Sequence, residues 1–279
     1  IDRSLDYAVQ IETAMRREGH SVVNVPVFDP DLATRLRHFE PDRYVVLNWC
    51  ECLPGLPRSE ALVAQTLEAM HFVYTGSPAD VLALTWDKCQ VKRLLDQMQV
   101  PTPRWRVYET PDTDGWDCFP AIVKPAWEHC SLGVTPEAVV LTAAELRHRI
   151  AHVLTAYAQP ALVEDFIDGR EFHVSLWGNG TVQMLPPAEM DFAAFSDVHD
   201  RLCTYESKHI PGSRPYEEIR LRLPAPLAED EYTLLEQTAI RAYRALGCRD
   251  YARLDIRLRD GVFYVLDVNT NADLSPDAS

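Results

Sequence analysis

Residues 252–269 form two runs in which polar and apolar side chains alternate, separated by a turn at Gly261. A period of two is the pattern of a β-strand, because successive side chains point to opposite faces. Two such runs joined by a glycine turn predict a β-hairpin. One face of this hairpin carries Arg253, Asp255, Asp267 and Asn269, and the other turns Leu254 and Val268 toward the core. The pattern requires a half-buried sheet.

Three of these side chains, Asp255, Asp267 and Asn269, place hard oxygen atoms at the ends of the predicted strands. Such oxygens suit Mg²⁺ held against the phosphates of a nucleotide. The alternative is a half-buried hairpin with a solvated polar face, since charged side chains are mostly exposed. The rest of the chain decides between the two interpretations.

The composition is that of a soluble globular protein with room for two or three packed units. The chain has 279 residues, of which 47% are hydrophobic and 25% charged. Its net charge of −15 argues against nucleic acid and against an anionic membrane surface as partners, because phosphate groups attract basic surfaces. Any phosphate-binding site must therefore be local.

Seven cysteines occur without a repeated CxxC spacing. Their odd number and irregular spacing indicate neither a zinc site nor a disulfide framework, so reduced thiols and a cytoplasmic location are expected. No apolar run approaches about eighteen residues, and the first residues, IDRSLDYAVQ, lack the basic and apolar regions of a signal peptide.

The N-terminal part of the chain alternates helical and strand patterns. Helices are predicted over 5–17, after Pro30 and over 57–70, and strands over 21–27 and 44–49. This alternation predicts a parallel sheet with helices on its faces. Ligands bind beyond the carboxyl ends of such strands, so residues 48–52 and 74–77 are the candidate rim of a site. Tyr74 itself is expected to be a packing aromatic.

The rest of the chain is richer in β-strands. Helices are predicted over 87–97, 143–156 and 229–246, and strands over 104–108 and 121–124. A second β-rich stretch begins at residue 161, and the sequence Gly178-Asn-Gly180 within it is a strong hairpin signal. The last helix is expected to turn Leu234, Leu235, Ile240 and Ala242 inward.

Phosphate binding must rely on lysines, because neither a GxGxxG fingerprint nor a Walker loop occurs. Lys124 ends an apolar strand and precedes a loop with Ser131 and Gly133, whose backbone donors could cover a phosphate. Glu164 and Glu171 could accept hydrogen bonds from ribose or adenine. Each of these charged residues, taken alone, is more often an ordinary surface residue.

Five segments, in order, resemble the ATP-grasp ligases, and most closely the D-alanine–D-alanine ligase group. YTGSPADVLALTWDKCQVK at 74–92 looks like the family's entry to its central domain, and FPAIVKPAWEHCSLGV at 119–134 resembles its lysine strand and phosphate-covering loop. VEDFIDGREFHV at 163–174 is similar to its nucleotide hinge. YESKH at 205–209 and the RLD and DVNTN runs of the C-terminal hairpin are similar to its Y-x-x-K element and its metal site.

The resemblance implies an α/β fold, with an α+β arrangement in the ATP-grasp part. An N-terminal parallel-sheet domain, called pre-ATP-grasp, is expected over residues 1–85. The two subdomains of the ATP-grasp fold are expected over 86–162 and 163–279, the second of them with the metal site.

The resemblance also implies a role for each site residue. Lys88, Lys124 and Ser131 would hold the phosphates of ATP, Glu164, Phe166 and Ile167 would line the adenine, Glu171 would bind the ribose, and Lys208 would approach the γ-phosphate. Asp255, Asp267 and Asn269 would hold one or two Mg²⁺ ions, or Mn²⁺. Arg253 would face the growing oxyanion. The implied reaction is attack of a carboxylate on the γ-phosphate, followed by attack of an amine on the acylphosphate.

The chain departs from the family near the substrates. Asp267 stands where the family usually has Glu, and NTNADLSPDAS replaces a segment with Pro-Gly and a substrate-binding Ser, for which Ser279 falls about one residue late. No Gly-rich turn or ammonium-binding Glu appears before Gly19. Cys130 and His209 replace a Ser and an aromatic residue. Cys130 is expected to be a small buried thiol rather than a nucleophile.

Three functional interpretations remain open. The resemblance favours an ATP-dependent ligase of the D-alanine–D-alanine type, acting in the cytoplasm in peptidoglycan biosynthesis on small-molecule substrates, with a homodimer as a common assembly. A ligase joining other amino acids in another pathway is the second interpretation. The third is an ATP-binding regulatory module without ligase activity.

Overall fold

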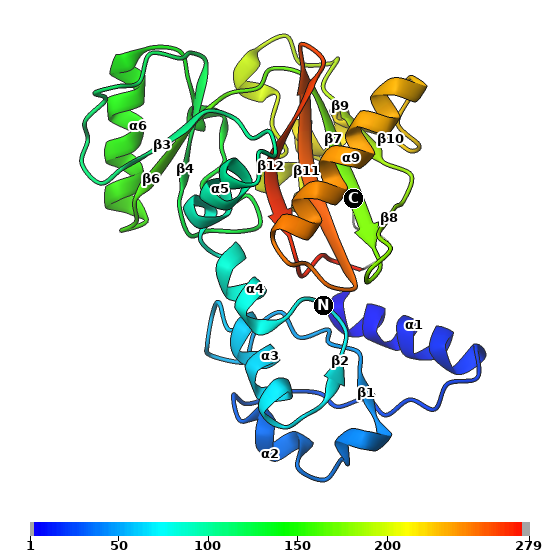
Figure 1. Ribbon diagram of the computed structural model, residues 1–279. Helices are drawn as coiled ribbons and strands as arrows, with labels where there is room; N and C mark the ends of the chain where they lie inside the picture. Colours follow the sequence, from blue (N-terminus) through cyan, green and yellow to red (C-terminus); the bar gives the residue numbers. More distant parts are fainter. Residues whose placement is uncertain (1–2, 275–279) are drawn as a thin grey trace.

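The computed structural model describes residues 3–274, which form three β-sheets and the helices that cover them (Figure 1). The α-helices are α1 Arg3–Arg17, α2 Leu32–Leu36, α3 Glu60–Ala69, α4 Ala79–Thr85, α5 Lys88–Gln97, α6 Ala143–Ala156, α7 Tyr205–His209, α8 Arg214–Glu218 and α9 Glu229–Ala245. The strands are β1 Val45–Val46, β2 Val73–Tyr74, β3 Trp105–Tyr108, β4 Ala121–Pro125, β5 Val139–Val140, β6 Ala161–Asp165, β7 Arg170–Trp177, β8 Gln183–Met184, β9 Ala188–Asp191, β10 Arg220–Arg222, β11 Tyr251–Arg259 and β12 Val262–Asn269.

The N-terminal lobe contains the predicted parallel sheet in a reduced form. Strands β1 and β2 pair in parallel, and apolar side chains of α2, α3 and α4 pack together beside them. The predicted strand over 44–49 is limited to Val45–Val46, and the strand expected over 21–27 is absent from that segment. Pro26 has no N–H to donate to a neighbouring strand. Val25 and Val27 pack against the core of the lobe, but the segment pairs with no strand among the described residues.

The four-stranded sheet has the order β3-β6-β4-β5, with antiparallel pairing between neighbours. Helix α6 covers one face of it by burying Leu146, Ile150 and Val153, which recur at the spacing of one helical stripe. The helix begins where the Thr142 hydroxyl accepts a hydrogen bond from the backbone N–H of Glu145, which fulfils the usual role of an N-cap. The predicted helix over 143–156 is confirmed.

The six-stranded sheet follows the order β10-β9-β7-β11-β12, and β8 pairs with β7. The predicted hairpins at Gly178 to Gly180 and at Gly261 are both confirmed as antiparallel pairs. Helices α5 and α9 pack on this sheet through a shared apolar core. Leu235 and Ala242 lie in that core and Ile240 packs against it, but Leu234 is exposed, so its predicted inward orientation is wrong.

The N-terminal lobe and the six-stranded sheet are joined by residues far apart in the chain. The carboxylate of Asp250 accepts a hydrogen bond of 2.9 Å from the backbone N–H of Gly76, and Arg249 Nε donates one of 2.8 Å to the Gly76 carbonyl. These contacts fasten the N-terminal lobe to the start of β11. Residues 74–77 therefore contact the six-stranded sheet rather than forming the rim of a site, and Tyr74 is buried as a packing aromatic.

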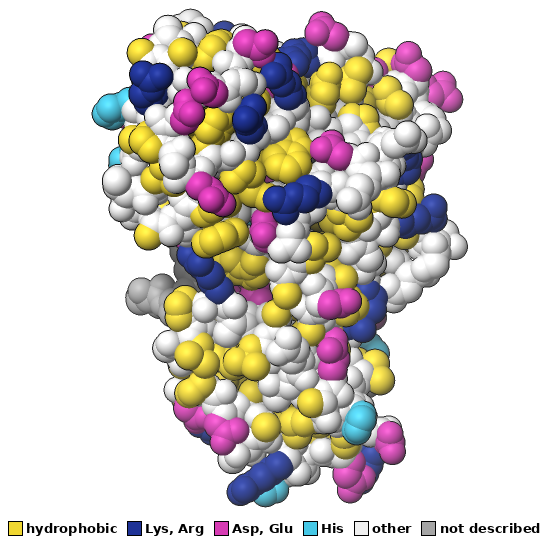
Figure 2. All heavy atoms as spheres, turned by 60° about the vertical axis from the view of Figure 1, so that its left-hand side comes forward, with side chains coloured by type: hydrophobic (Ala, Val, Ile, Leu, Met, Phe, Trp, Pro, Cys, Tyr) yellow, Lys and Arg dark blue, Asp and Glu magenta, His cyan; other side chains and the backbone are white. Residues whose placement is uncertain are grey.

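The surface mixes charges of both signs. Figure 2 shows basic and acidic side chains interspersed over one face of both lobes. Every helix within residues 3–274 is too short or too polar to span a lipid bilayer.

The expected division of the chain at residues 85/86 and 162/163 stays a proposal. Because β6 spans Ala161–Asp165, we propose that the second division follows Asp165.

Candidate active site

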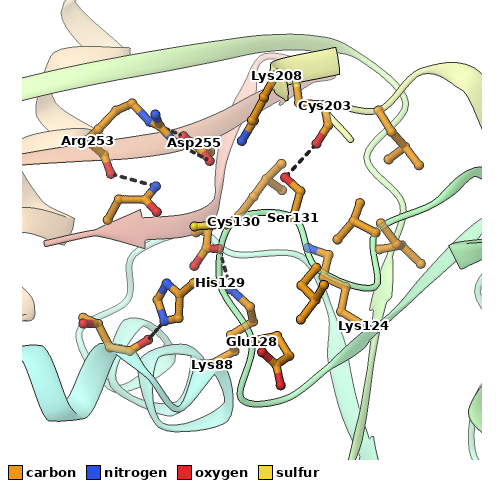
Figure 3. A pocket seen from close by; sticks show the side chains of 18 of the residues that line it. Lys88, Lys124, Glu128, His129, Cys130, Ser131, Cys203, Lys208, Arg253 and Asp255 are labelled. Carbon is orange, nitrogen blue, oxygen red and sulfur yellow. Dashed lines mark hydrogen bonds and ion pairs between the residues drawn. The ribbon is translucent and has the colours of Figure 1, made fainter. Parts of the chain in front are cut away.

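The predicted site residues line one cavity of about 330 Å³. They are Lys88, Lys124, Ser131, Glu164, Phe166, Ile167, Glu171, Lys208, Arg253, Asp255, Asp267 and Asn269. Helix α5, the four-stranded sheet and the six-stranded sheet all contribute to its walls. Figure 3 shows the side chains of Lys88, Lys124, Lys208 and Arg253 pointing toward a common space. Residues that are up to about one hundred and eighty positions apart are thus brought together, for instance Lys88 and Asp267.

The polar face of the C-terminal hairpin is formed as predicted. Arg253 pairs with Asn269 across the two strands, and Asp255 pairs with Asp267. Leu254 and Val268, which alternate with them, are buried in the core. Asp255 nevertheless lies in the middle of β11 rather than at its end, because β11 continues to Arg259 as the strand between β7 and β12.

Each acidic residue on this face has a cationic partner. Lys88 Nζ lies 2.5 Å from the Asp267 carboxylate, and Arg253 Nε lies 3.0 Å from that of Asp255. Burial alone would raise the pKa of Asp267, but the Lys88 ammonium holds it well below its ordinary value. The pKa of Asp255 is likewise lowered, chiefly by Arg253 against the effect of burial. Both carboxylates are ionised oxygen donors beside the Asn269 amide, a donor set that fits Mg²⁺.

A buried ion network lies beneath the phosphate lysines. Lys92 Nζ and Lys124 Nζ lie 2.6 and 2.7 Å from the two carboxylate oxygens of Glu164. Lys92 also donates to Thr102 Oγ1 and to the carbonyl oxygens of Val265 and Leu266 in β12. Burial would raise the pKa of Glu164, but Lys124 and Lys92 together lower it to about 2.

This network assigns Glu164 and Lys92 to a supporting position. The Glu164 carboxylate holds Lys124 in place, and the Glu164 backbone lies in β6 between β3 and β4. Lys92 joins α5, the four-stranded sheet and the strand that carries Asp267. No role was derived for Lys92 from the sequence. The sequence feature that could have identified Lys92 is its spacing of four from Lys88, which places both lysines on one face of a helix.

The loop after β4 has an unusual backbone. Cys130 and Ser131 both adopt positive φ, at 54° and 59°, which is uncommon for residues other than glycine. The Ser131 hydroxyl donates a 2.9 Å hydrogen bond to the Cys203 carbonyl (Figure 3), so the loop is tied to the segment before α7. Cys130 is exposed, and its predicted burial is wrong because the residue lines the open cavity.

Gly133 closes this loop against β4. A Cβ atom there would lie 2.7 Å from Pro125 Cγ, and the φ of 79° is unfavourable for other residues. We expect Gly133→Ala to shift the loop and lower kcat/KM for ATP by about tenfold to a hundredfold. Gly180→Ala is the matched control, since Gly180 has a similar φ of 73° with no atom near the added Cβ. Equal losses in the two variants would contradict the assignment.

Arg257 organises the expected nucleotide-base edge, although no role was derived for it from the sequence. Its Nε lies 2.7 Å from Glu171 Oε2, and its Nη1 donates to the Ile167 carbonyl at 2.9 Å. The pKa of Glu171, which burial would raise, is held low chiefly by this guanidinium. Phe166 and Ile167 are buried at the end of β6, as an apolar wall beside the cavity.

Lys208 lies on α7, which begins at Thr204 as its N-cap. Its side chain is half-buried and points toward Asp255 (Figure 3). His209, the next residue, also lines the cavity but is largely exposed. Ser279 lies outside residues 3–274, so the structure does not describe this predicted position.

The end of the cavity near residue 271 carries three carboxylates. Glu51 and Asp273 come from two separate loops and Glu60 from the first residue of α3, and all three line the cavity together with Asn271 and Cys130. Burial and the neighbouring Glu51 raise the pKa of Glu60 to about 7, although Asn271 donates a hydrogen bond to it. Of the predicted rim over 48–52, Glu51 is the residue that reaches the cavity. The acidic character of this end was not predicted.

Glu60 is expected to make stability depend on pH. A pKa that is higher in the folded protein than the ordinary 4.5 means that folding favours the protonated acid. Its contribution is complete at low pH and is lost as the pH rises through about 7. We expect the unfolding free energy of the native chain to fall, relative to that of Glu60→Gln, between about pH 5 and about pH 8. Urea denaturation of both proteins measures this, and parallel pH profiles would contradict it.

Comparison with protein families identifies similarity over most of the chain. The family model described as D-ala D-ala ligase C-terminus matches residues 104–275. An uncharacterised protein of Sinorhizobium fredii, y4sG, is 35% identical over 277 residues, covering 96% of this chain and 79% of that protein. The D-alanine–D-alanine ligase of Pseudothermotoga lettingae is 30% identical over 269 residues, covering 96% of this chain and 83% of that ligase.

Solved structures share the fold. The D-alanine–D-alanine ligase of Bacillus anthracis in complex with ATP superposes with a TM-score of 0.72 at 20% identity, over 99% of this chain and 84% of that one. An L-amino acid ligase of Bacillus licheniformis gives a TM-score of 0.57 at 23% identity, over 76% and 46% of the two chains. The predicted fold class, a parallel-sheet lobe followed by an ATP-grasp fold, is confirmed.

Proposed function

This chain belongs to the D-alanine–D-alanine ligase family, and from that premise we propose that it joins two amino acids, or closely related molecules, through an acylphosphate. As a member of this family it is an ATP-dependent carboxylate–amine ligase. The identity and chirality of both substrates, the choice of Mg²⁺ or Mn²⁺, a cytoplasmic role in peptidoglycan synthesis and a homodimeric assembly all belong to the proposal.

The observation that supports the proposal is the meeting of cationic and acidic groups in one cavity. Lys88 and Lys124 are already paired with Asp267 and Glu164, and Arg253 is paired with Asp255. A triphosphate can take over the lysine contacts, since each ammonium has three donors and strong affinity for phosphate oxygens. Such a set of groups suits phosphoryl transfer, in which positioning and charge neutralisation provide most of the catalysis.

Each residue is then given one task. Lys88 and Lys124 bind the phosphates, and Lys208 reaches the γ-phosphate. Asp255, Asp267 and Asn269 would hold Mg²⁺, which neutralises phosphate charge when it is bound. The carboxylate of the first substrate attacks the γ-phosphorus, and the bond to the bridging oxygen of ADP breaks. The amine then attacks the acyl carbon, and the tetrahedral intermediate releases phosphate.

Arg253 is positioned for that last step. Its guanidinium lies on the same face as the metal-binding oxygens and stays charged at all relevant pH values. Asp255 fixes its orientation through the 3.0 Å contact, so little reorganisation is required when negative charge develops on the substrate oxygen. Donors held in advance in this way stabilise an oxyanion strongly.

We further propose that the amine enters from the acidic end of the cavity. An ammonium group is attracted by Glu51, Glu60 and Asp273, whereas the lysines occupy the phosphate end. Glu60→Gln is therefore expected to raise KM for the amine more than KM for ATP. Steady-state kinetics with each substrate varied in turn measures this, and an equal rise in both constants would argue against the assignment.

The direct test is ADP release with ATP and Mg²⁺ in the presence of single and paired D- and L-amino acids, with products identified by mass. Asp267→Asn provides a control that should abolish release, because it removes an ionised ligand and the partner of Lys88. Release with D-alanine and a dipeptide of the matching mass would support the substrates proposed. Release with other pairs would keep the ligase and change its pathway.

One observation favours the alternative of other amino acids. Asn271, Ala272 and Asp273 stand where the resembling group has Pro-Gly, and they lie at the acidic end of the cavity. A second carboxylate in the acceptor would meet Asp273 and Glu60 at close range, so a basic or uncharged acceptor is better accommodated. The panel of amines should therefore include lysine, ornithine and simple diamines.

A regulatory module without ligase activity would not be expected to retain all of the lysines and carboxylates of the cavity.

A further inference from the structure

Three side chains of different chemistry meet beneath the expected ribose position. Glu171 and His173 lie two residues apart on β7 and so share a face of the strand, and Cys203 approaches from the segment before α7. One ligand atom from each, a carboxylate oxygen, an imidazole nitrogen and the sulfur, lies within 4.8 Å of the other two. Glu171 and His173 are buried, and Cys203 is half-buried beside the cavity.

We propose that Glu171, His173 and Cys203 form a site for Zn²⁺ that is separate from the Mg²⁺ face. Thiolate, imidazole and carboxylate are the ligands that Zn²⁺ takes in proteins, and three protein ligands leave a fourth position open. A sulfur and a nitrogen ligand select against Mg²⁺, which prefers oxygen alone. Bond lengths of about 2.0–2.3 Å correspond to ligand separations of about 3.3–3.8 Å. Glu171 and His173, at 3.7 Å, already lie at such a separation, and any pair at the 4.8 Å limit would have to close in by about 1 Å.

The neighbours of the three groups suit a bound cation. Arg257 binds Glu171 Oε2, which leaves Oε1 as the oxygen that faces His173 Nε2 at 3.7 Å. Such a contact orients a ligand carboxylate without occupying its second oxygen. The Asp255 carboxylate lies 3.9 Å from His173 Nε2. The Cys203 thiolate and the carboxylates of Glu171 and Asp255 together offset the charges of Zn²⁺ and of the Arg257 guanidinium that is paired with Glu171.

Metal binding replaces a proton. Burial and the neighbouring Glu171 raise the pKa of the Cys203 thiol well above its usual range, so without metal the thiol is protonated and hydrogen-bonded to Glu171. When Zn²⁺ binds, a Zn–S bond forms, the S–H bond breaks and the proton passes to solvent. Binding is therefore expected to release one proton for each Zn²⁺ and to weaken as the pH falls.

Zn²⁺ and ATP are expected to compete. The competition rests on the proposed role of Glu171 as the ribose-binding residue, since one carboxylate cannot hold the ion and the ribose together. Zn²⁺ at this position would then act as an inhibitor that leaves the Mg²⁺ face unchanged. None of this follows from the cysteine spacing, because Cys203 and the two β7 residues are about thirty positions apart in the chain.

The test uses Co²⁺ as a spectroscopic probe with the full chain and no nucleotide. A charge-transfer absorption band from the thiolate to Co²⁺ is expected in the native protein, and Zn²⁺ should displace it. The band should be lost in Cys203→Ser and retained in Cys130→Ser, which removes a thiol of the same cavity that is outside the trio. His173→Gln should weaken the band in the same way and covers the case in which Cys203→Ser fails to fold. Absence of the band, or its persistence in Cys203→Ser, would overturn the site.

Addition of ATP distinguishes a failure of the proposed Zn²⁺ site from a failure of the role proposed for Glu171 in binding the ribose. Added ATP without Mg²⁺ is compared with a matched concentration of tripolyphosphate, which chelates Co²⁺ in solution but has no ribose. A greater loss of the band with ATP supports the shared use of Glu171. Equal losses would leave the metal site in place and overturn the assignment of Glu171 to the ribose. Ligase activity enters neither measurement.

Discussion

Replacing Arg253 by alanine is expected to lower kcat by about a hundredfold to a thousandfold while ATP affinity changes much less. The guanidinium is proposed to stabilise negative charge that exists only in the transition state, and loss of one such donor has effects of this size. Lys88 and Lys124, which are proposed to bind the phosphates of ATP, keep their own partners in the variant. The prediction is checked by kcat from ADP release and by the dissociation constant of ATP.

Arg253→Lys is the matched variant. It retains the charge beside Asp255 but loses the planar fork that holds the contact of 3.0 Å, so an intermediate kcat is expected. Arg253→Ala also frees Asp255, whose carboxylate can then bind a metal ion more strongly. Equal losses of kcat and of ATP affinity in the alanine variant would contradict the proposed role and would indicate a binding residue.

Lys92→Met is expected to lower the free energy of unfolding by about 3–5 kcal/mol, the cost of leaving a buried ion without one of its partners. Lys92 is 1% exposed and lies 2.6 Å from Glu164, which is equally buried. Its removal also leaves the Val265 and Leu266 carbonyls without the side-chain donor that they share. Urea denaturation followed by far-ultraviolet circular dichroism gives the measurement.

Arg104→Met is the control for that prediction. Arg104 forms an ion pair with Asp117 at 2.6 Å, but both side chains are largely exposed. An exposed pair contributes about 0–1 kcal/mol, because water screens the charges. A loss below about 1 kcal/mol in Lys92→Met would show that Lys124 alone satisfies Glu164, and that Lys92 does not join the two sheets.

Local pattern predicted most of the secondary structure. The C-terminal hairpin and helices α5 and α6 were correctly inferred, because alternation and helical spacing report directly which side chains a sheet or helix can bury. The strand predicted over 21–27 is wrong, because alternation by itself does not supply a neighbouring strand. Its alternating valines resemble a strand, but a strand exists only where a neighbour accepts its hydrogen bonds, and no segment within residues 3–274 pairs with it.

Leu234 and Cys130 show a second kind of error. A helical stripe is about three residues wide, so its edge is not defined by spacing, and Leu234 lies just outside the part of α9 that the sheet covers. Cys130 was judged from the usual burial of a thiol. Its turn has a positive φ that no residue type in the loop predicts, and the residue lines the open cavity instead.

The sequence by itself determined the order of the elements, the alternation that places Asp255, Asp267 and Asn269 on one face, and the family to which the chain belongs. These are properties of neighbouring residues, and neighbouring residues constrain one another through backbone geometry alone. The tertiary structure decided which charges meet, from the buried network of Lys92, Glu164 and Lys124 to the acidic end around Glu60. Such contacts join residues from separate elements. They depend on how the sheets pack and on which side chains that packing removes from solvent. No local pattern contains that information.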